Sequence, residues 1–371
     1  MEKNRVRVLQ VTGGLGQGGL QTVTMNIVRY MDRERFAFDF LVLGGKEGVY
    51  EQEAARLGCQ IFRAEKTKDT LSYYQSIKRA IRAHGPYDAV ISHTFLNSGI
   101  VLRAAKKCGV KTCVAYAHSA KRGRRGALKA LSYQVLRHWI NRYADIRAAC
   151  SGAAGAYVFR KKKPFYVIHN GVKTSDFKYS EAARREIRQS LGLQDQYVIG
   201  NVGRLSAEKN QAFLVQVLNE LIQSGRDAVL LLVGEGNERE AIEKAVRETG
   251  LQEKVILTGD RSDVPALLSA MDAFLFPSFH EGLGICAIEA QASGLPTICA
   301  DTVPKEVGIT ELVSFKSLRD GPKAWAEEIC RAGQNGNREA YCRAVAEKGY
   351  SVEACIGRLQ EIIDGFQGQT R

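Results

Sequence analysis

The sequence predicts an α/β protein built from two doubly wound parallel sheets. Short, continuous apolar runs alternate with helical patterns over most of the chain, as in parallel sheets that helices cover on both faces. Eleven such runs are too many for one small sheet. The length of 371 residues also exceeds the usual size of one domain, which is about 100–200 residues.

The apolar runs form two series. The first series of expected strands is Val6–Val11, Phe38–Leu43, Ala89–Ser92, Thr112–Ala117, Ile146–Cys150 and Tyr166–Ile168. The second series is Tyr197–Val202, Ala228–Val233, Val255–Thr258, Ala273–Pro277 and Thr297–Ala300. Helical patterns between them include Gln21–Met31, Val49–Arg56, Ser72–Ala83, Gly126–Tyr143, Gln211–Ser224, Glu238–Glu248, Val264–Ala270 and Gly284–Ala292. Beyond Thr310 the pattern predicts helix to the end.

The break between the two series lies near Asn170–Gly192. Asn170-Gly171 is a turn signal, and the polar stretch Lys173–Arg185 has no strong apolar period. We therefore expect a first domain over residues 1–175 and a second over 176–348. A C-terminal helix over 349–371 is expected to pack back toward the first domain.

Composition excludes several classes of protein. Hydrophobic residues are 45% and charged residues 25% of the chain, which excludes a disordered or fibrous protein. No apolar run reaches the ~18 residues that a membrane-spanning helix needs, and the N-terminus has no signal-peptide pattern. The nine cysteines are scattered without C-x-x-C spacing, so we expect free, mostly buried thiols, no zinc site and a cytosolic location.

The net charge of +13 is divided unevenly along the chain. Residues 1–175 hold 31 Lys and Arg against 11 Asp and Glu, or 31 − 11 = +20. Residues 176–371 hold the other 22 and 29, or 22 − 29 = −7. An excess of this kind indicates an acidic partner for the first half, either nucleic acid or an anionic membrane surface.

A glycine-rich loop follows the first expected strand. Gly14, Gly16 and Gly19 match G-x-G-x-x-G, in which backbone N–H groups approach a phosphate at a helix N-terminus. The second strand ends Leu41–Gly45 without the acidic residue that holds a nicotinamide ribose, and no Walker lysine follows. A loop facing another kind of phosphate is favoured over a tight turn that binds no ligand.

The second half carries two charged loops at expected strand ends. Strand Tyr197–Val202 leads into Gly203–Asn210, which contains Arg204 and Lys209. A planar guanidinium that donates two hydrogen bonds and a compact ammonium charge together suit a diphosphate ligand. Strand Ala273–Pro277 leads through Glu281 into a helix that contains Glu289. Ligands of α/β sheets bind at such strand ends. The alternative is solvated surface charge, although Glu289 lies in an otherwise apolar helix, where a carboxylate is costly.

These motifs resemble those of the retaining GT-B glycosyltransferases of family GT4 (group 1), and most of all the enzymes of capsular and exopolysaccharide assembly. The resemblance covers almost the whole chain. Its motifs are the glycine loop, G-R-L-x-x-x-K-N at Gly203–Asn210, E-x7-E from Glu281 to Glu289, and the segments Ile168–Val172 and Gly259–Val264. The family implies two Rossmann-like domains facing a cleft that binds a nucleotide-sugar donor.

The resemblance also implies roles for individual residues. Arg204 and Lys209 would bind the diphosphate and stabilise the leaving group, Glu289 would hold the ribose, and Glu281 would contact the transferred sugar. The other donor-binding positions would be Gly14, Gly16, Gly203, Arg261, Leu283, Gly284 and Ile285. The family's donor-side histidine maps to His118 after strand Thr112–Ala117. His93, which ends strand Ala89–Ser92, is the competing candidate. Gly284 and Cys286 stand where the family often has larger side chains, so the donor sugar stays open.

The expected reaction is metal-independent transfer, with retention, of a hexose from a nucleotide sugar to a lipid-linked or saccharide acceptor in cell-surface polysaccharide assembly. A UDP-sugar is favoured over a GDP-sugar. No D-x-D-like pair indicates a metal–diphosphate site, and no cofactor is expected, because two cations and N–H dipoles can neutralise the leaving diphosphate. The alternatives are a non-catalytic nucleotide-sugar-binding protein and a GT-B nucleotide-sugar epimerase or hydrolase.

The excess of positive charge is concentrated in residues 121–163, which contain twelve Lys and Arg and one acid. Lys121, Arg122, Arg124 and Arg125 precede a helix with apolar residues at three- or four-residue steps: Leu128, Leu131, Val135, Trp139 and Tyr143. Basic side chains near an anionic leaflet contribute about 1 kcal/mol each. We expect this face to bind the inner surface of the cytoplasmic membrane, where a lipid-linked acceptor would lie. A solvated face over an ordinary core helix is the alternative. Nucleic acid is not expected, because no recognised binding module appears.

Overall fold

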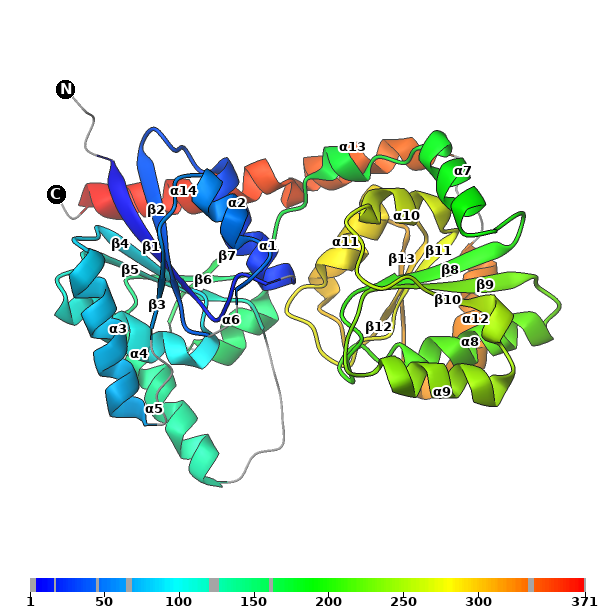
Figure 1. The fold of residues 1–371 in the computed structure, drawn as a ribbon, viewed down its shortest axis with the longest axis horizontal. Coiled ribbons are helices and arrows are strands. Elements are labelled where there is room, and N and C mark those ends of the chain that lie inside the picture. Colours follow the sequence, from blue (N-terminus) through cyan, green and yellow to red (C-terminus); the bar gives the residue numbers. More distant parts are fainter. Residues whose placement is uncertain are drawn as a thin grey trace. The chain divides into compact units, whose positions relative to one another are not determined.

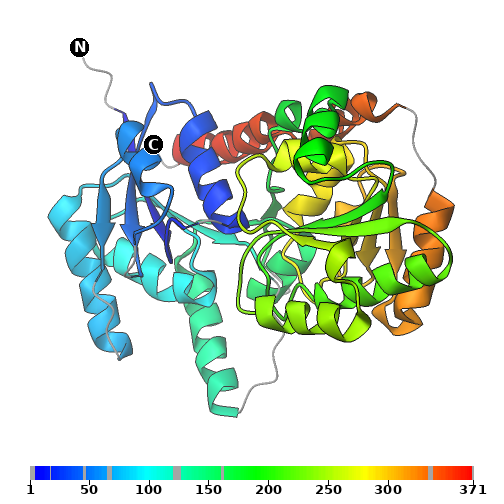
Figure 2. The ribbon, with the colours of Figure 1, turned by 45° about the vertical axis from the view of Figure 1, so that its right-hand side comes forward.

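The computed structural model describes residues 5–16, 18–44, 47–64, 69–119, 127–159, 163–332 and 337–369. Contacts divide the chain into two compact units, which we call the first and the second unit (Figures 1 and 2). The first unit holds the residues up to Gly171 and those from Val352 onward, and the second runs from Val172 to Ser351. The chain passes from one unit to the other at 171/172 and at 351/352, and we call these two points the crossings. They lie a few residues from the expected boundaries at 175/176 and 348/349.

The first unit contains a seven-stranded sheet in the order β3-β2-β1-β4-β5-β6-β7, with every pairing parallel. The strands are β1 (Val6–Thr12), β2 (Phe36–Val42), β3 (Ile61–Arg63), β4 (Ala89–Ser92), β5 (Thr112–Ala117), β6 (Ile146–Ala149) and β7 (Tyr166–Val167). The helices between them are α1 (Gly19–Tyr30), α2 (Glu51–Arg56), α3 (Thr70–His84), α4 (Ser98–Lys107), α5 (Ala127–Tyr143) and α6 (Gly152–Val158). The direction of strand succession reverses between β1 and β4, which makes their carboxyl ends a topological switch point.

The second unit contains a six-stranded parallel sheet in the order β10-β9-β8-β11-β12-β13. The strands are β8 (Tyr197–Val202), β9 (Ala228–Val233), β10 (Val255–Leu257), β11 (Ala273–Phe276), β12 (Thr297–Ala300) and β13 (Val313–Lys316). The helices are α7 (Glu181–Ser190), α8 (Ala212–Gln223), α9 (Arg239–Thr249), α10 (Val264–Ala270), α11 (Ile285–Ala292), α12 (Gly321–Ala332) and α13 (Tyr341–Val345). Here the switch point lies between β8 and β11.

The two parallel α/β sheets confirm the fold class predicted from the sequence. Two strands were not predicted, and both lie at sheet edges: β3 in the first sheet and β13 in the second. The prediction of helix throughout the chain beyond Thr310 was wrong, because Val313 pairs with Thr297 and Lys316 with Ala300. These strands are short and only half-buried, so their pairing depends on the sheet beside them rather than on a local apolar run.

The C-terminal helix α14 (Val352–Gln369) belongs to the first unit and packs on α1. Figure 1 shows this helix in red, beside the first sheet. Five of its residues join the buried core of that unit: Val352, Cys355, Ile356, Leu359 and Ile363. An ion pair between Arg35 and Asp364 at 2.8 Å also ties the helix to the unit. At the crossings, the N–H of Val172 donates to the carbonyl of Tyr350 at 2.9 Å.

The cysteines are free thiols, as expected. Five of them are buried: Cys59, Cys113, Cys150, Cys299 and Cys355. Cys330 is exposed, and the other three are partly accessible. Burial raises the pKa of the Cys113 thiol to about 12, so the buried thiols are neutral at physiological pH and act as small apolar side chains.

Candidate functional site

Two loops meet at the switch point of the second sheet. One follows β8 and runs over Gly203–Asn210, and the other follows β11 and leads to α11. The backbone N–H of Phe279 donates to the carbonyl of Glu208 at 2.9 Å, and the Asn210 amide donates to the carbonyl of Pro277 at 3.3 Å. These contacts hold the two sequence-predicted motifs against each other, at the edge of the sheet where parallel-sheet proteins bind ligands.

Lys209 and Glu281 form an ion pair across these loops. The Nζ atom of Lys209 lies 2.6 Å from Oε1 of Glu281, and the two side chains are only 22% and 12% exposed. The ammonium also lies 5.0 Å from the centre of the Phe276 ring. Burial works against the charge of Lys209, but the Glu281 carboxylate outweighs it and raises the pKa of the ammonium. Lys209 is therefore a cation at physiological pH, held at the switch point.

Arg204 lies on the same loop but points into solvent. Its residue is exposed, and no ion pair of its guanidinium is found within the described part of the chain. The loop beneath it is fixed, because the Gln211 amide donates to the Arg204 carbonyl at 3.0 Å. Arg204 is thus a cation on a fixed backbone whose side chain is available to an anionic ligand.

Glycines permit close approach of the backbones around this edge. Gly203 has φ of 154°, and a Cβ on Gly234 would stand 2.3 Å from the Gly203 carbonyl oxygen. Gly284 is the N-cap of α11 with φ of 101°, and a Cβ there would stand 2.9 Å from the Phe276 ring. Leu283 before it is buried, and Ile285 begins the helix. The α11 N-terminus is therefore anchored beside the ring that contacts Lys209.

Glu289 is the fifth residue of α11, just over one turn after the N-cap Gly284. It is partly accessible, and burial raises the pKa of its carboxyl to about 7. The pKa of the Cys286 thiol is raised to about 12. Burial is the largest cause; Glu289 and Glu281 add to the rise, and Lys209 opposes it. Three of the predicted site residues therefore influence the same thiol electrostatically.

Glu289→Gln is expected to raise the melting temperature at pH 8.5. Well below pH 4.5 the Glu289 carboxyl is protonated in both the folded and the unfolded chain. As the pH rises toward 7, this carboxyl ionises in the unfolded chain before it ionises in the folded one. The free energy of unfolding therefore falls by up to about 3 kcal/mol. The glutamine variant lacks this loss, so its advantage should grow between pH 5 and 8.5 in thermal melts. The exposed Glu248→Gln should show no such pH dependence. Identical melting curves for Glu289→Gln and wild type at all pH values would contradict the raised pKa of the Glu289 carboxyl.

Arg261 is engaged within its own loop. Its guanidinium makes two contacts to the Asp263 carboxylate, at 2.7 and 2.5 Å, and it is 38% exposed. Nearby, the Glu235 N–H donates to Asp260 at 3.1 Å, and the Gly234 N–H donates to the Gly259 carbonyl. The structure therefore joins the loops that follow β9 and β10, and it gives Arg261 a partner that the sequence reasoning did not anticipate.

The switch point of the first sheet carries the glycine loop and both candidate histidines. Leu15 is fully buried and anchors the loop, whereas Gly14 and Gly16 are partly accessible. His93 follows β4, and its Nδ1 atom lies 2.9 Å from Nε2 of His118, which follows β5. Burial lowers the pKa of His118 to about 4, and the neighbouring Asn170 side chain partly opposes this shift. The two histidines that sequence reasoning treated as alternatives are thus direct partners.

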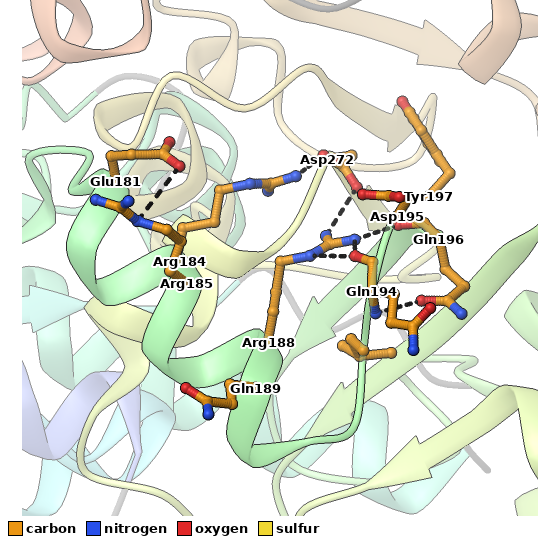
Figure 3. Close-up of a pocket in the computed structure, with 11 residues that line it drawn as sticks. Glu181, Arg184, Arg185, Arg188, Gln189, Gln194, Asp195, Gln196, Tyr197 and Asp272 are labelled. Atoms are coloured by element: carbon orange, nitrogen blue, oxygen red, sulfur yellow. Dashed lines mark hydrogen bonds and ion pairs between the residues drawn. The ribbon is translucent and has the colours of Figure 1, made fainter.

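A hollow of about 510 Å³ lies at the opposite, amino-terminal edge of the second sheet. Figure 3 shows Arg184 and Arg188 reaching from α7 toward Asp272, which directly precedes β11. Arg184 contacts Asp272 at 2.7 Å, and Arg188 contacts it at 3.4 Å and donates to the carbonyls of Gln194 and Gln196. The guanidinium groups of Arg184 and Arg188 already have partners, so these two side chains fasten α7 to the sheet and are not free to bind a ligand.

The predicted membrane face is only partly described. Lys121, Arg122, Arg124 and Arg125 lie outside the described residues. On α5 the side chains of Leu131 and Val135, one turn apart, are 66% and 43% exposed. This part of the apolar stripe therefore does not pack inward as in an ordinary core helix.

Neither a metal cluster nor a membrane-spanning helix occurs in the described part of the chain. Its residues include no group of three or more His, Cys, Asp or Glu side chains arranged to hold a metal ion. None of the helices that they form has the length and apolarity to cross a bilayer.

Comparisons with known proteins identify the family of the chain. The family profile described as "Glycosyl transferases group 1" matches residues 183–348, and that described as "Glycosyl transferase 4-like domain" matches residues 18–171. The chain is 31% identical over 374 residues to the putative glycosyltransferase EpsF of Bacillus subtilis (strain 168), covering 98% of this chain and 97% of that protein. It is 26% identical over 302 residues to the UDP-Gal:alpha-D-GlcNAc-diphosphoundecaprenol alpha-1,3-galactosyltransferase of Escherichia coli, covering 76% of each.

Solved structures share the fold at lower identity. Anabaena Alr3699/HepE in complex with UDP and glucose superposes with a TM-score of 0.79 at 20% identity, covering 97% of this chain and 100% of that one. The two Rossmann-like sheets are those of the GT-B glycosyltransferase fold, as predicted. The chain belongs to the group 1 glycosyltransferases, family GT4, and it is an enzyme of the transferase class.

Sequence reasoning missed the polar side chains that lie beside the two candidate histidines. Gln10, which is fully buried in β1, hydrogen-bonds His93 at 3.1 Å. Asn170 lies beside His118. A polar residue inside an otherwise apolar strand was the available signal for Gln10, because a buried amide requires partners. No comparable signal pointed to Asn170, whose Asn-Gly pair indicated only a turn.

Proposed function

We propose that this glycosyltransferase transfers a hexose, with retention and without a metal, from a nucleotide-sugar donor to a lipid-linked or saccharide acceptor in cell-surface polysaccharide assembly. The observation that carries the proposal is the Lys209–Glu281 pair, 2.6 Å apart at the switch point of the second sheet. The bound UDP and UDP-glucose of the Anabaena structures support a UDP-sugar in preference to a GDP-sugar. The diphosphoundecaprenol acceptor named for the Escherichia coli relative supports a lipid-linked acceptor.

In this proposal two cations stabilise the leaving diphosphate. Lys209 supplies a partly buried point charge, and Arg204 closes on the diphosphate from solvent. Preorganised cations of this kind act where negative charge develops, so they lower the barrier more than they strengthen substrate binding. Glu281 keeps Lys209 in position and contacts hydroxyls of the transferred sugar. Backbone N–H groups at Leu283–Ile285 add the positive end of the α11 dipole.

Glu289 is the proposed ribose ligand. A buried carboxylate gains hydrogen bonds when it accepts from two ribose hydroxyls, which offsets the cost of its burial. The Gly259–Val264 loop, with Arg261, would lie near the base. In the first unit, Gly14 and Gly16 would offer backbone N–H groups to the diphosphate, and His118 would contact the donor sugar.

The proposed step is a same-face displacement. The bond from the anomeric carbon to the diphosphate oxygen breaks while the acceptor oxygen bonds to the same face of that carbon. The acceptor proton passes to the leaving phosphate oxygen. Glu281 is occupied by Lys209, so it is a poor nucleophile for a glycosyl-enzyme intermediate, and this pairing supports the same-face route.

A donor screen followed by a transfer assay tests the proposal. UDP-, GDP- and ADP-sugars are added in turn, and a bound donor at 100 times its Kd stabilises the protein by about 2.7 kcal/mol. We expect a UDP-sugar to give the largest shift and an EDTA-treated enzyme to keep full transfer activity. Product with an inverted anomeric centre, or strict dependence on Mg²⁺, would contradict the proposed mechanism. Donor binding without any turnover would favour the non-catalytic alternative, and acceptor-independent turnover would favour an epimerase or hydrolase.

We also propose that the enzyme is cytoplasmic and docks on the inner face of the cytoplasmic membrane through Lys121, Arg122, Arg124 and Arg125 and the exposed side of α5. The exposed Leu131 and Val135 support this proposal, since apolar side chains beside basic ones suit a lipid interface. Co-sedimentation should rise with the anionic lipid content of liposomes and should be lost when Arg122, Arg124 and Arg125 are changed to Glu. Binding that depends neither on anionic lipid content nor on these charge reversals would contradict the proposed docking surface.

A further inference from the structure

His93 is an imidazole buried in the first unit, for which the proposed reaction has no direct use. It is 2% exposed, and burial, with a smaller effect of His118, lowers its pKa well below the ordinary value. It therefore stays neutral at physiological pH. A neutral imidazole carries one proton on one of its two nitrogens, so each nitrogen is either a donor or an acceptor.

The hydrogen bonds around His93 determine which nitrogen carries the proton. The Nε2 amide of Gln10 donates to the carbonyl of Thr24 at 3.1 Å, so Oε1 of Gln10 faces His93. An amide oxygen only accepts, so Nε2 of His93 must carry the proton. The Nδ1 atom of His93 is then an acceptor, and the Nε2 atom of His118, 2.9 Å away, must donate to it.

His118 is held on more than one side. Its ring stacks on Tyr116, with centroids 4.3 Å apart, and Asn170 lies beside it. The Tyr116 hydroxyl is itself fixed, because it donates to the carbonyl of Ile168 at 2.9 Å. With its proton on Nε2, neutral His118 keeps the lone pair on Nδ1, a nitrogen that is buried.

We infer that His93 is a positioning residue, which uses Gln10 and Thr24 to hold His118 as its neutral Nε2–H tautomer at the end of β5. The chain of donors runs in one direction, from His118 through His93 and Gln10 to a backbone carbonyl. Its consequence for catalysis rests on the proposed role of His118 at the donor sugar. When the proton position and the ring plane are fixed, a ligand meets a single arrangement of donor and acceptor nitrogens and not a mixture of two tautomers.

Nitrogen-15 NMR of the full chain with labelled histidine tests the inference directly. At pH 7 we expect the wild-type spectrum to show both His93 and His118 as Nε2–H tautomers. Detection of His118 as the Nδ1–H tautomer, or as a mixture, would overturn the inference. This measurement needs neither a substitution nor a known substrate.

Two substitutions extend the test. His93→Leu removes the acceptor, so His118 should lose its Nε2–H preference, and kcat/KM should fall by about 10–100-fold, as for outer partners that orient other functional imidazoles. His93→Asn places an amide oxygen near the former Nδ1 position and should restore both the tautomer and most of the activity. Ser92→Ala is the matched control, since Ser92 is buried at the same strand end and bonds Ser98 instead.

The outcomes separate the inference from the proposed function. An unchanged His118 spectrum in His93→Leu would overturn the positioning role. A changed tautomer with unchanged transfer activity would support that role and would instead reject the proposed contact between His118 and the donor sugar.

Discussion

Lys209→Ala is expected to lower kcat/KM by about 10²–10³-fold, with the larger part of the loss in kcat. In the proposed mechanism Lys209 places a partly buried positive charge where the diphosphate leaves. Removal of one preorganised group of this kind costs about 3–4 kcal/mol of transition-state stabilisation. Steady-state kinetics with the donor found in the screen measure the effect. A near-normal kcat would remove Lys209 from the site.

Two control variants separate lost catalysis from lost structure. Lys254→Ala breaks another 2.6 Å ion pair of the second unit, with Asp227, on the exposed surface, and it should leave kinetics unchanged. Lys209→Ala also leaves Glu281 buried without its cation, which costs stability. The double variant Lys209→Ala/Glu281→Gln relieves that cost. If it also recovered activity, Lys209 would serve only to neutralise Glu281, and the leaving-group assignment would fail.

Asp272→Ala is expected to destabilise the second unit by about 3–5 kcal/mol. Its carboxylate is 6% exposed, contacts Arg184 and Arg188, and accepts from the Val198 N–H at 2.8 Å. Loss of the carboxylate leaves two partly buried guanidinium groups without their anion, which is the costly way to break a buried ion pair. The contacts that connect α7 to the amino ends of β8 and β11, beside the hollow in Figure 3, would then be lost.

Urea unfolding followed by fluorescence measures this effect. Trp325 is fully buried in the second unit, so a Trp139→Phe background restricts the signal to that unit and avoids treating a two-unit chain as one transition. The exposed Glu248→Ala, which breaks a 3.7 Å pair with Lys244, should cost less than about 1 kcal/mol. A loss for Asp272→Ala no larger than for Glu248→Ala would show that the arginines find other partners.

Much of the fold followed from local patterns in the sequence. Continuous apolar runs such as Ala228–Val233, all of whose residues are buried, predict parallel strands because both faces of such a sheet are covered. The edge strands β3 and β13 escaped prediction because half-buried edge positions accept mixed side chains, so no local periodicity marks them. The helix α7 was likewise not predicted, because its apolar face is narrow and two of its three arginines, Arg184 and Arg188, turn inward to pair with Asp272.

The loops of the proposed site followed from the sequence by itself. A strand's end is a local property, so the residue pattern alone assigns Gly203–Asn210, Glu281 and the two histidines to strand ends. Which strand ends meet was decided only by tertiary structure. β8 lies next to β11 although β9 and β10 intervene in the chain, and this order joins Lys209 to Glu281. The pairing of β4 with β5 brings His93 within hydrogen-bond distance of His118. Local periodicity reports burial and direction but not strand order, because order depends on contacts between residues far apart in the chain.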